Sequence, residues 1–204
     1  MMSAMGIDYI LKGATEEDIR IVQNILDVCK GRPDFDSDCG KGKGAKVVSS
    51  ETLDLSDHNS IGFDLCEKGT ITVKTYSREG IVYYDESDRK VLLEQLVLMF
   101  SGSQFADIDL ADSFPVFEKK CCFSYIEYKK GELLEKATNL LENATKGLSK
   151  DSISIFAQHE YTDISEMSST EDELHNKFPN ILIQVGMNRE EVDNGVFAAF
   201  IASV

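Results

Sequence analysis

The sequence predicts an α+β fold, an α/β sandwich in which helices pack on a mixed β-sheet. Turn-rich hairpin patterns occupy the middle of the first half. The second half reads strand, helix, strand, helix, strand, strand, an order that requires at least one parallel crossover. With 204 residues, 42% of them hydrophobic, the chain can bury a sizeable core. We expect a β-rich part at 1–87 and a sandwich at 88–204, either as two parts or as one continuous domain.

The first predicted elements are a strand and an amphipathic helix. The strand covers "GIDYILKG", residues 6–13. In "TEEDIRIVQNILDVCKG", Thr15 stands before the first turn and Asp18 follows three residues later, which is close to a capping box. Apolar residues then recur at helical spacing, and Gly31 and Pro33 end the helix.

Three short strands and a buried helix complete the first half. The segments "SIGFDLC", "TITVKTY" and "GIVYYD" carry apolar or β-branched residues at strand spacing, with hairpin-turn residues between them. Ser87 is expected to cap the helix that follows over "DRKVLLEQLVLMF". Its apolar residues occupy more than one face, which predicts a central, buried helix.

The second half is expected to open with a strand over "CCFSYIEYKK" and an amphipathic helix over "GELLEKATNLLENATKG". Gly147 suits the left-handed position after that helix. The next elements are a strand over 151–160, a polar connection over 161–169, and a short helix in which Thr170 and Glu173 form a capping pair. Two final strands are joined by a turn rich in Asn, Asp and Gly. The inward residues of the amphipathic helix are Leu133, Ala137, Leu140, Leu141 and Ala144.

Charge is the distinctive property of the composition. The chain has 36 acidic and 21 basic residues, a formal net charge of −15. The electrostatic field of such a charge repels phosphate backbones, so we expect no nucleic-acid partner. The same field favours solubility and would attract a basic protein.

The cysteines favour a reducing, cytoplasmic compartment. They are odd in number and form no CxxC pair, so neither a disulfide framework nor a zinc site is expected. No signal peptide is visible at the start, and no apolar run approaches the length of a membrane span. Cys29, Cys66 and Cys121 fall among apolar residues and should act as small hydrophobes. The five cysteines are Cys29, Cys39, Cys66, Cys121 and Cys122.

The stretch "DFDSDCGKGKGAK", from Asp34 to Lys46, has features of a calcium loop and of a phosphate loop. As an EF-hand it has Cys39 where a glycine is needed and Ala45 where a bidentate glutamate is needed, so divalent-cation affinity should be poor. As a phosphate loop it lacks a hydroxyl residue after either lysine. We interpret it as a connector, with weak binding of a cation or an anion left open. The three aspartates at cation-ligand positions are Asp34, Asp36 and Asp38.

No catalytic constellation is visible, and we expect no cofactor. None of His58, His159 and His175 pairs with another at helical spacing, and no nucleophile elbow is present. Cys121 and Cys122 start a strand, so their side chains should point to opposite faces, one buried and one exposed.

The segment "FADIDLADSF" places three acids within a few residues of one another: Asp107, Asp109 and Asp112. Carboxylates this close must be solvated, cap a helix or meet a cation. Asp112 could cap a short turn through "SFPVF". The segment is also a candidate interaction site.

A core helix followed by "DIDLAD" resembles the core helix and acidic loop of the FtsZ/tubulin family, in which the loop runs Asn-x-Asp-Phe-Ala-Asp. "FSYIEYKKGELLEKATNLLENATKGLSKDSISIFAQ" and "NILIQVGMNREEVDNGVFAAFIAS" resemble that family's C-terminal domain, so the likeness covers Asp88 to Val204. Residues 1–87 show no glycine-rich nucleotide loop, and Asp107 stands in the place of the family's Asn. The resemblance implies that Asp109 and Asp112 present an acidic loop to nucleotide held by a partner.

Two function classes follow. The first is a non-catalytic interaction protein that docks on a tubulin-like GTPase or on copies of itself. The second is an acidic inhibitor or immunity-type protein that neutralises a basic toxin or nuclease, with association sped by opposite fields. An enzyme is the least favoured class, because no nucleophile–base pair is visible.

Overall fold

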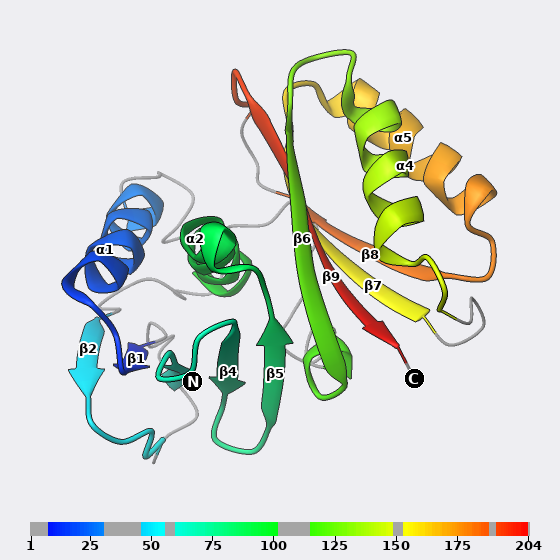
Figure 1. Cartoon of the computed structure of the whole chain (residues 1–204). Coiled ribbons are helices and arrows are strands. Elements are labelled where there is room, and N and C mark those ends of the chain that lie inside the picture. Colours follow the sequence, from blue (N-terminus) through cyan, green and yellow to red (C-terminus); the bar gives the residue numbers. More distant parts are fainter. Residues whose placement is uncertain are drawn as a thin grey trace, which may run out of the picture. The chain divides into compact units, whose positions relative to one another are not determined.

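A computed structural model describes residues 8–30, 46–55, 60–101, 115–148, 153–187 and 191–203. The chain divides into two compact units, residues 1–103 and 104–204. In each unit helices pack on strands that pair in both parallel and antiparallel fashion, which confirms the predicted α/β sandwich with mixed pairing (Figure 1). The sequence boundary at residue 87 differs from this division, because the helix that follows residue 88 packs within the first unit.

The first unit has strand order β2-β1-β3-β4-β5. β1 is parallel to both β2 and β3, while β3, β4 and β5 form an antiparallel meander through the two predicted hairpins. The sequence did not predict β2, a four-residue strand that reaches its place beside β1 after the α1 crossover. The elements are β1 (Asp8–Lys12), α1 (Glu16–Lys30), β2 (Val47–Ser50), β3 (Ser60–Asp64), β4 (Thr70–Lys74), β5 (Glu79–Tyr83), the 3-10 helix η1 (Glu86–Asp88) and α2 (Arg89–Ser101).

The start of α1 is capped as predicted. The Thr15 amide donates to the Asp18 carboxylate at 2.7 Å, and the Asp18 amide donates to the Thr15 hydroxyl at 3.2 Å. The same carboxylate, 4% exposed, accepts two hydrogen bonds of 2.9 Å from the guanidinium of Arg89. Arg89 also donates to the hydroxyl of Tyr84. This ion pair therefore ties α1, α2 and the end of β5 together.

α2 is largely buried, as its apolar composition predicted, and it packs against α1. Ring contact between Phe63 and Phe100 and a 3.4 Å hydrogen bond from Tyr9 to the Val97 carbonyl hold it over β1 and β3. The prediction that Ser87 caps this helix is wrong. Ser87 lies inside η1 and its hydroxyl donates to Asp88, because the chain tightens into a 3-10 turn before α2 begins.

The second unit has strand order β6-β9-β7-β8, and this part of the chain keeps the predicted element order. β6 and β7 are both antiparallel to β9, whereas β8 is parallel to β7 after the α5 crossover. The elements are β6 (Lys120–Tyr128), α4 (Leu133–Ala144), β7 (Ile153–Glu160), α5 (Ile164–Lys177), β8 (Leu182–Met187) and β9 (Gly195–Ser203).

α4 and α5 lie side by side on one face of this sheet (Figure 1). Buried side chains of α4, α5 and all four strands form one core, to which the predicted inward residues of α4 contribute. Gly147 has a φ of 83°, the left-handed conformation predicted after α4. Gly195 faces the ring of Tyr128 so closely that any side chain would collide with it. The core members include Tyr128, Leu141, Ile155, Leu174, Phe178 and Phe197.

The prediction of a polar connection over 161–169 is wrong, since α5 begins at Ile164. The side chain of Asp163 accepts hydrogen bonds from the amides of Ser165 and Glu166 and caps the helix there. Thr170, predicted as a cap, lies buried within the helix. The first half of α5 presents only Met167 and Thr170 to the core, so its serines and threonines hid the helical periodicity.

The prediction for Cys121 and Cys122 is confirmed, and the prediction for Cys66 is wrong. On β6, Cys121 is buried and Cys122 is exposed, as strand alternation predicted. Cys66 was expected among apolar neighbours but is exposed, because the chain leaves the sheet two residues earlier, at the end of β3.

Candidate interaction site

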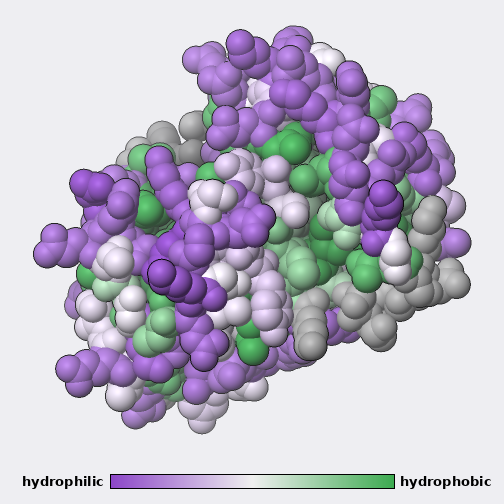
Figure 2. Space-filling model, viewed as in Figure 1, coloured by the Kyte–Doolittle hydropathy of each residue, from purple (hydrophilic) through white to green (hydrophobic). Residues whose placement is uncertain are grey.

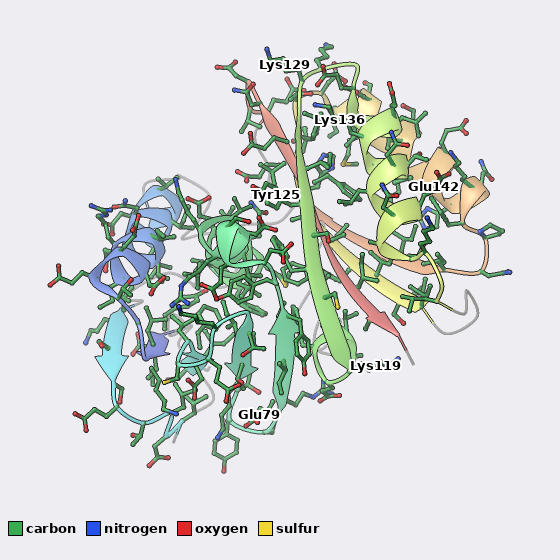
Figure 3. All side chains as sticks on the ribbon, viewed as in Figure 1. Glu79, Lys119, Tyr125, Lys129, Lys136 and Glu142 are labelled. Carbon is green, nitrogen blue, oxygen red and sulfur yellow. The ribbon has the colours of Figure 1, made fainter. Side chains whose placement is uncertain are left out.

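A groove runs between β6 and α4 in the second unit, with a volume of about 640 Å³. Figure 2 shows hydrophobic side chains gathered in a hollow beside these two elements. Figure 3 places Lys136 on the β6 side of α4 and Glu142 on its opposite side, so the groove follows the flank of α4 that faces away from α5. We call it the α4–β6 groove. Its lining residues are Ser124, Ile126, Glu127, Lys136, Asn139, Leu140, Asn143 and Ala144.

The floor of the α4–β6 groove is apolar. Ile126 on β6 and Leu140 and Ala144 on α4 are half-buried, and each packs against the core of the unit. Leu140 and Ala144 are four residues apart, so they lie one above the other on the same flank of the helix. The groove exists because α4 covers this face of the sheet without reaching over the whole width of β6.

The rim of the α4–β6 groove is polar and holds one cation. The ammonium of Lys136 lies 2.9 Å from the Glu132 carboxylate and donates to the Glu127 carbonyl at 3.0 Å. The hydrogen bond from Lys136 lowers the pKa of Glu132. Both side chains are more than two-fifths exposed, so the pair orients the rim and contributes little stability.

Carboxylates at one end of the second unit fix the position of α4. Glu166 on α5 accepts hydrogen bonds from the amides of Gly131 and Leu133, the latter at 3.1 Å. The Leu133 amide is one of the unpaired donors in the first turn of α4, and the Gly131 amide lies just before that turn. Lys130 pairs with Asp163 and lowers the pKa of that carboxyl group, so the starts of both helices are joined by charge.

A buried histidine lies under the same helices. His159 is 1% exposed, and its Nε2 lies 2.5 Å from the hydroxyl of Tyr128. Burial lowers the pKa of His159 to about 3 and raises that of Tyr128. His159 is therefore neutral at pH 7 and serves packing. No local sequence pattern indicates this burial, because Tyr128, the residue that contacts His159, is 31 residues away.

A second, smaller crevice of about 430 Å³ lies in the first unit at the carboxyl ends of β1, β2 and β3. The ammonium of Lys12 lies 2.6 Å from the Asp64 carboxylate there, and Cys66 lines the wall. The hydrogen bond to Asp64 raises the pKa of the Cys66 thiol. A reactive cysteine needs the opposite shift, so this arrangement does not activate a nucleophile.

The predicted acidic positions lie outside the described residues. They are Asp34, Asp36 and Asp38 of the connector, and Asp107, Asp109 and Asp112 of the acidic segment. Within the part of the chain that the structure describes, no group of three or more His, Cys, Asp or Glu side chains could hold a metal ion. In that same part, no helix is long and apolar enough to cross a membrane.

Comparison with known proteins gives a likeness of fold. No protein-family model and no curated protein matches the chain. Among solved structures, an FtsZ dimer of M. jannaschii matches 58% of this chain and 38% of its own, at 15% identity and a TM-score of 0.41. TubZ in GDP-form protofilaments, from Bacillus thuringiensis serovar israelensis, matches 97% of this chain and 53% of its own, at 10% identity and a TM-score of 0.38.

The resemblance is one of fold. It agrees with the FtsZ/tubulin likeness expected from the sequence. The chain spans about two-fifths of the length of the FtsZ chains that it matches, and no residue role is transferred from them.

Proposed function

We propose that this chain is a non-catalytic, acidic protein-interaction protein that docks on a tubulin-like GTPase or assembles with copies of itself. The choice of partner follows the acidic segment with Asp109 and Asp112 and its resemblance to the FtsZ/tubulin loop. The α4–β6 groove supports the part of the proposal that concerns docking.

The observation that carries the proposal is the α4–β6 groove. Its floor of Ile126, Leu140 and Ala144 is apolar and open to solvent, while its one cation is already paired at the rim. A docking surface typically combines an apolar centre with a polar rim, and this groove has that arrangement on a small scale. The groove spans about two turns of α4, roughly 12 Å, which suits one or two side chains of a partner.

The net charge of −15 supports the second candidate, an acidic inhibitor of a basic toxin or nuclease. The two candidates differ in their response to salt. Binding through opposite fields weakens steeply as ionic strength rises, whereas contact through an apolar groove does not.

Capture from native lysate at low and at high salt tests the proposal, with two tagged variants beside the unchanged chain. Asn143→Arg places a long side chain over the floor of the groove, and Asn176→Arg makes the same exchange at an exposed site on α5. We expect a tubulin-like GTPase, or untagged copies of this chain, to be retained at both salts, lost with Asn143→Arg and kept with Asn176→Arg.

Capture of a basic nuclease or toxin that salt releases would overturn the proposal in favour of the inhibitor. Equal retention of the partner by both variants would show that the α4–β6 groove is not the docking site. If a GTPase is captured, Asp109→Ala combined with Asp112→Ala should abolish any stimulation of its GTP hydrolysis, and unchanged stimulation would exclude a role of the loop.

A further inference from the structure

Two side-chain amides lie along the rim of the α4–β6 groove. Asn139 and Asn143 line the groove from α4, and both residues are exposed. Within the part of the chain that the structure describes, neither side-chain amide donates or accepts a hydrogen bond. Each amide carries one acceptor oxygen and two donor N–H groups. The rim therefore has hydrogen-bonding capacity that α4 itself does not use.

The spacing of these amides is close to the repeat of an extended chain. Residues four apart on a helix lie on one flank, about 6 Å apart along the axis. In an extended segment, the N–H and C=O of every second residue point to the same side, at intervals of about 6.4–6.8 Å. An asparagine amide can accept from such an N–H while it donates to the C=O of the same residue. Asn139 and Asn143 can therefore each bind one residue of an extended segment that follows α4.

The floor of the groove suits an apolar side chain of that same segment. Leu140 and Ala144 each follow one of the two asparagines, on the side of α4 nearer the core, and Ile126 lies beside them on β6. Side chains of an extended chain point away from the plane of its backbone groups, so one of them can reach this floor while the backbone contacts the amides. A helical partner has its backbone groups paired internally, and a small apolar molecule has none, so neither would use the amides.

The charges of the groove favour an uncharged segment. Lys136 is the one cation among the lining residues that the structure describes, and its ammonium contacts the Glu132 carboxylate and the Glu127 carbonyl. Glu127 follows Ile126 on β6, so strand alternation turns its carboxylate toward the opposite face of the sheet. The net charge of −15 repels an acidic segment. An uncharged segment meets neither repulsion nor a charge that needs a counter-ion.

We propose that the α4–β6 groove binds an uncharged, extended segment of a partner protein. The amides of Asn139 and Asn143 hold the backbone of the segment, and one apolar side chain of the segment lies on the floor. This inference rests on the proposed function, and it names the kind of segment through which the partner docks. Because backbone groups are common to all sequences, the single apolar side chain supplies the selectivity.

Titration of the isotope-labelled full chain with a capped peptide, followed by amide chemical shifts, tests the proposal. The probe is acetyl-Thr-Thr-Leu-Thr-Thr-amide, in which the threonines favour an extended backbone and the leucine supplies the apolar side chain. We expect the shifts to concentrate on the lining residues of the groove. The same peptide with aspartate in place of leucine should produce none.

Two protein variants test the role of the amides. Asn139→Leu and Asn143→Leu remove the hydrogen-bonding groups at similar side-chain size, and leucine favours a helix. Each should raise the Kd of the probe about five-fold, and the two together should abolish its shifts. Asn176→Leu, at an exposed position on α5, should leave the Kd unchanged. Leucine enlarges the apolar surface, so equal or tighter binding by the first two variants would overturn the proposal.

The proposal is also overturned if the probe causes no shifts or causes them outside the groove. Groove shifts that depend on protein concentration without the probe would overturn it too, because a second copy would then occupy the site. Capture from lysate separates this inference from the proposed function. A partner that both leucine variants retain and Asn143→Arg loses would overturn the backbone recognition and leave docking at the groove intact.

Discussion

Replacing Asp18 by alanine should destabilise the first unit more than any single surface change. The Asp18 carboxylate is 4% exposed, accepts two hydrogen bonds of 2.9 Å from Arg89, and caps α1 through Thr15. Its removal leaves the Arg89 side chain, 20% exposed, without its anion and leaves the amide of Thr15 unpaired. Breaking a buried pair in this way costs about 3–5 kcal/mol. We expect about 3 kcal/mol, because Arg89 keeps some solvent contact and its hydrogen bond to Tyr84.

Urea unfolding followed by circular dichroism measures this loss. With a slope of about 2 kcal/mol per molar urea, the midpoint should fall by about 1.5 M. Glu17→Ala is the matched control, because this neighbouring acid is 68% exposed and pairs with Arg20 at the surface. It should change stability by less than about 0.5 kcal/mol. An Asp18→Ala midpoint equal to that of Glu17→Ala would refute the view that the ion pair holds α1 and α2 together.

The folding stability of Asp18→Ala should also depend on pH differently from that of the unchanged chain. Burial alone would raise the pKa of Asp18, but the hydrogen bonds from Arg89 and Thr15 outweigh burial and hold the pKa below its ordinary value. A lowered pKa in the folded state stabilises the fold above the unfolded pKa of about 3.9, and this stabilisation is lost as pH falls through the folded pKa. The unchanged chain should therefore lose more stability than Asp18→Ala below about pH 4.

Two further predictions concern the second unit. The pKa of His159 is lowered to about 3, so unfolding takes up a proton below the ordinary value of about 6.5, and stability should fall by about 2 kcal/mol from pH 7 to pH 5. His159→Gln should lack this slope in urea unfolding and His175→Gln should keep it; equal slopes would contradict a buried neutral His159. Glu166→Ala removes the acceptor of the Gly131 and Leu133 amides and should cost about 2 kcal/mol, against less than about 0.5 for the exposed Glu173→Ala on the same helix. Equal thermal midpoints of these two variants would show that water replaces the Glu166 cap.

Elements with a local signature were predicted and elements defined by distant contacts were not. The pairing of Thr15 with Asp18 was visible because both groups lie within one turn, and the hairpins were visible because their turns bring neighbouring strands together. β2 was missed because its four residues show no alternation and it gains its order from pairing with β1. The α4–β6 groove arises from how far α4 reaches across β6, a tertiary property that no short pattern records.

The cap that Glu166 gives to α4 has a consequence for synthesis on the ribosome. Leu133 and Glu166 are 33 residues apart, so Glu166 emerges from the ribosome 33 residues after the first residue of the helix. At about 5–20 residues per second, the delay is roughly two to seven seconds. During this interval the first turn of α4 has only water for its amides. The order of translation therefore leaves the first turn of α4 without its protein acceptor until α5 emerges and Glu166 accepts the hydrogen bond from the Leu133 amide.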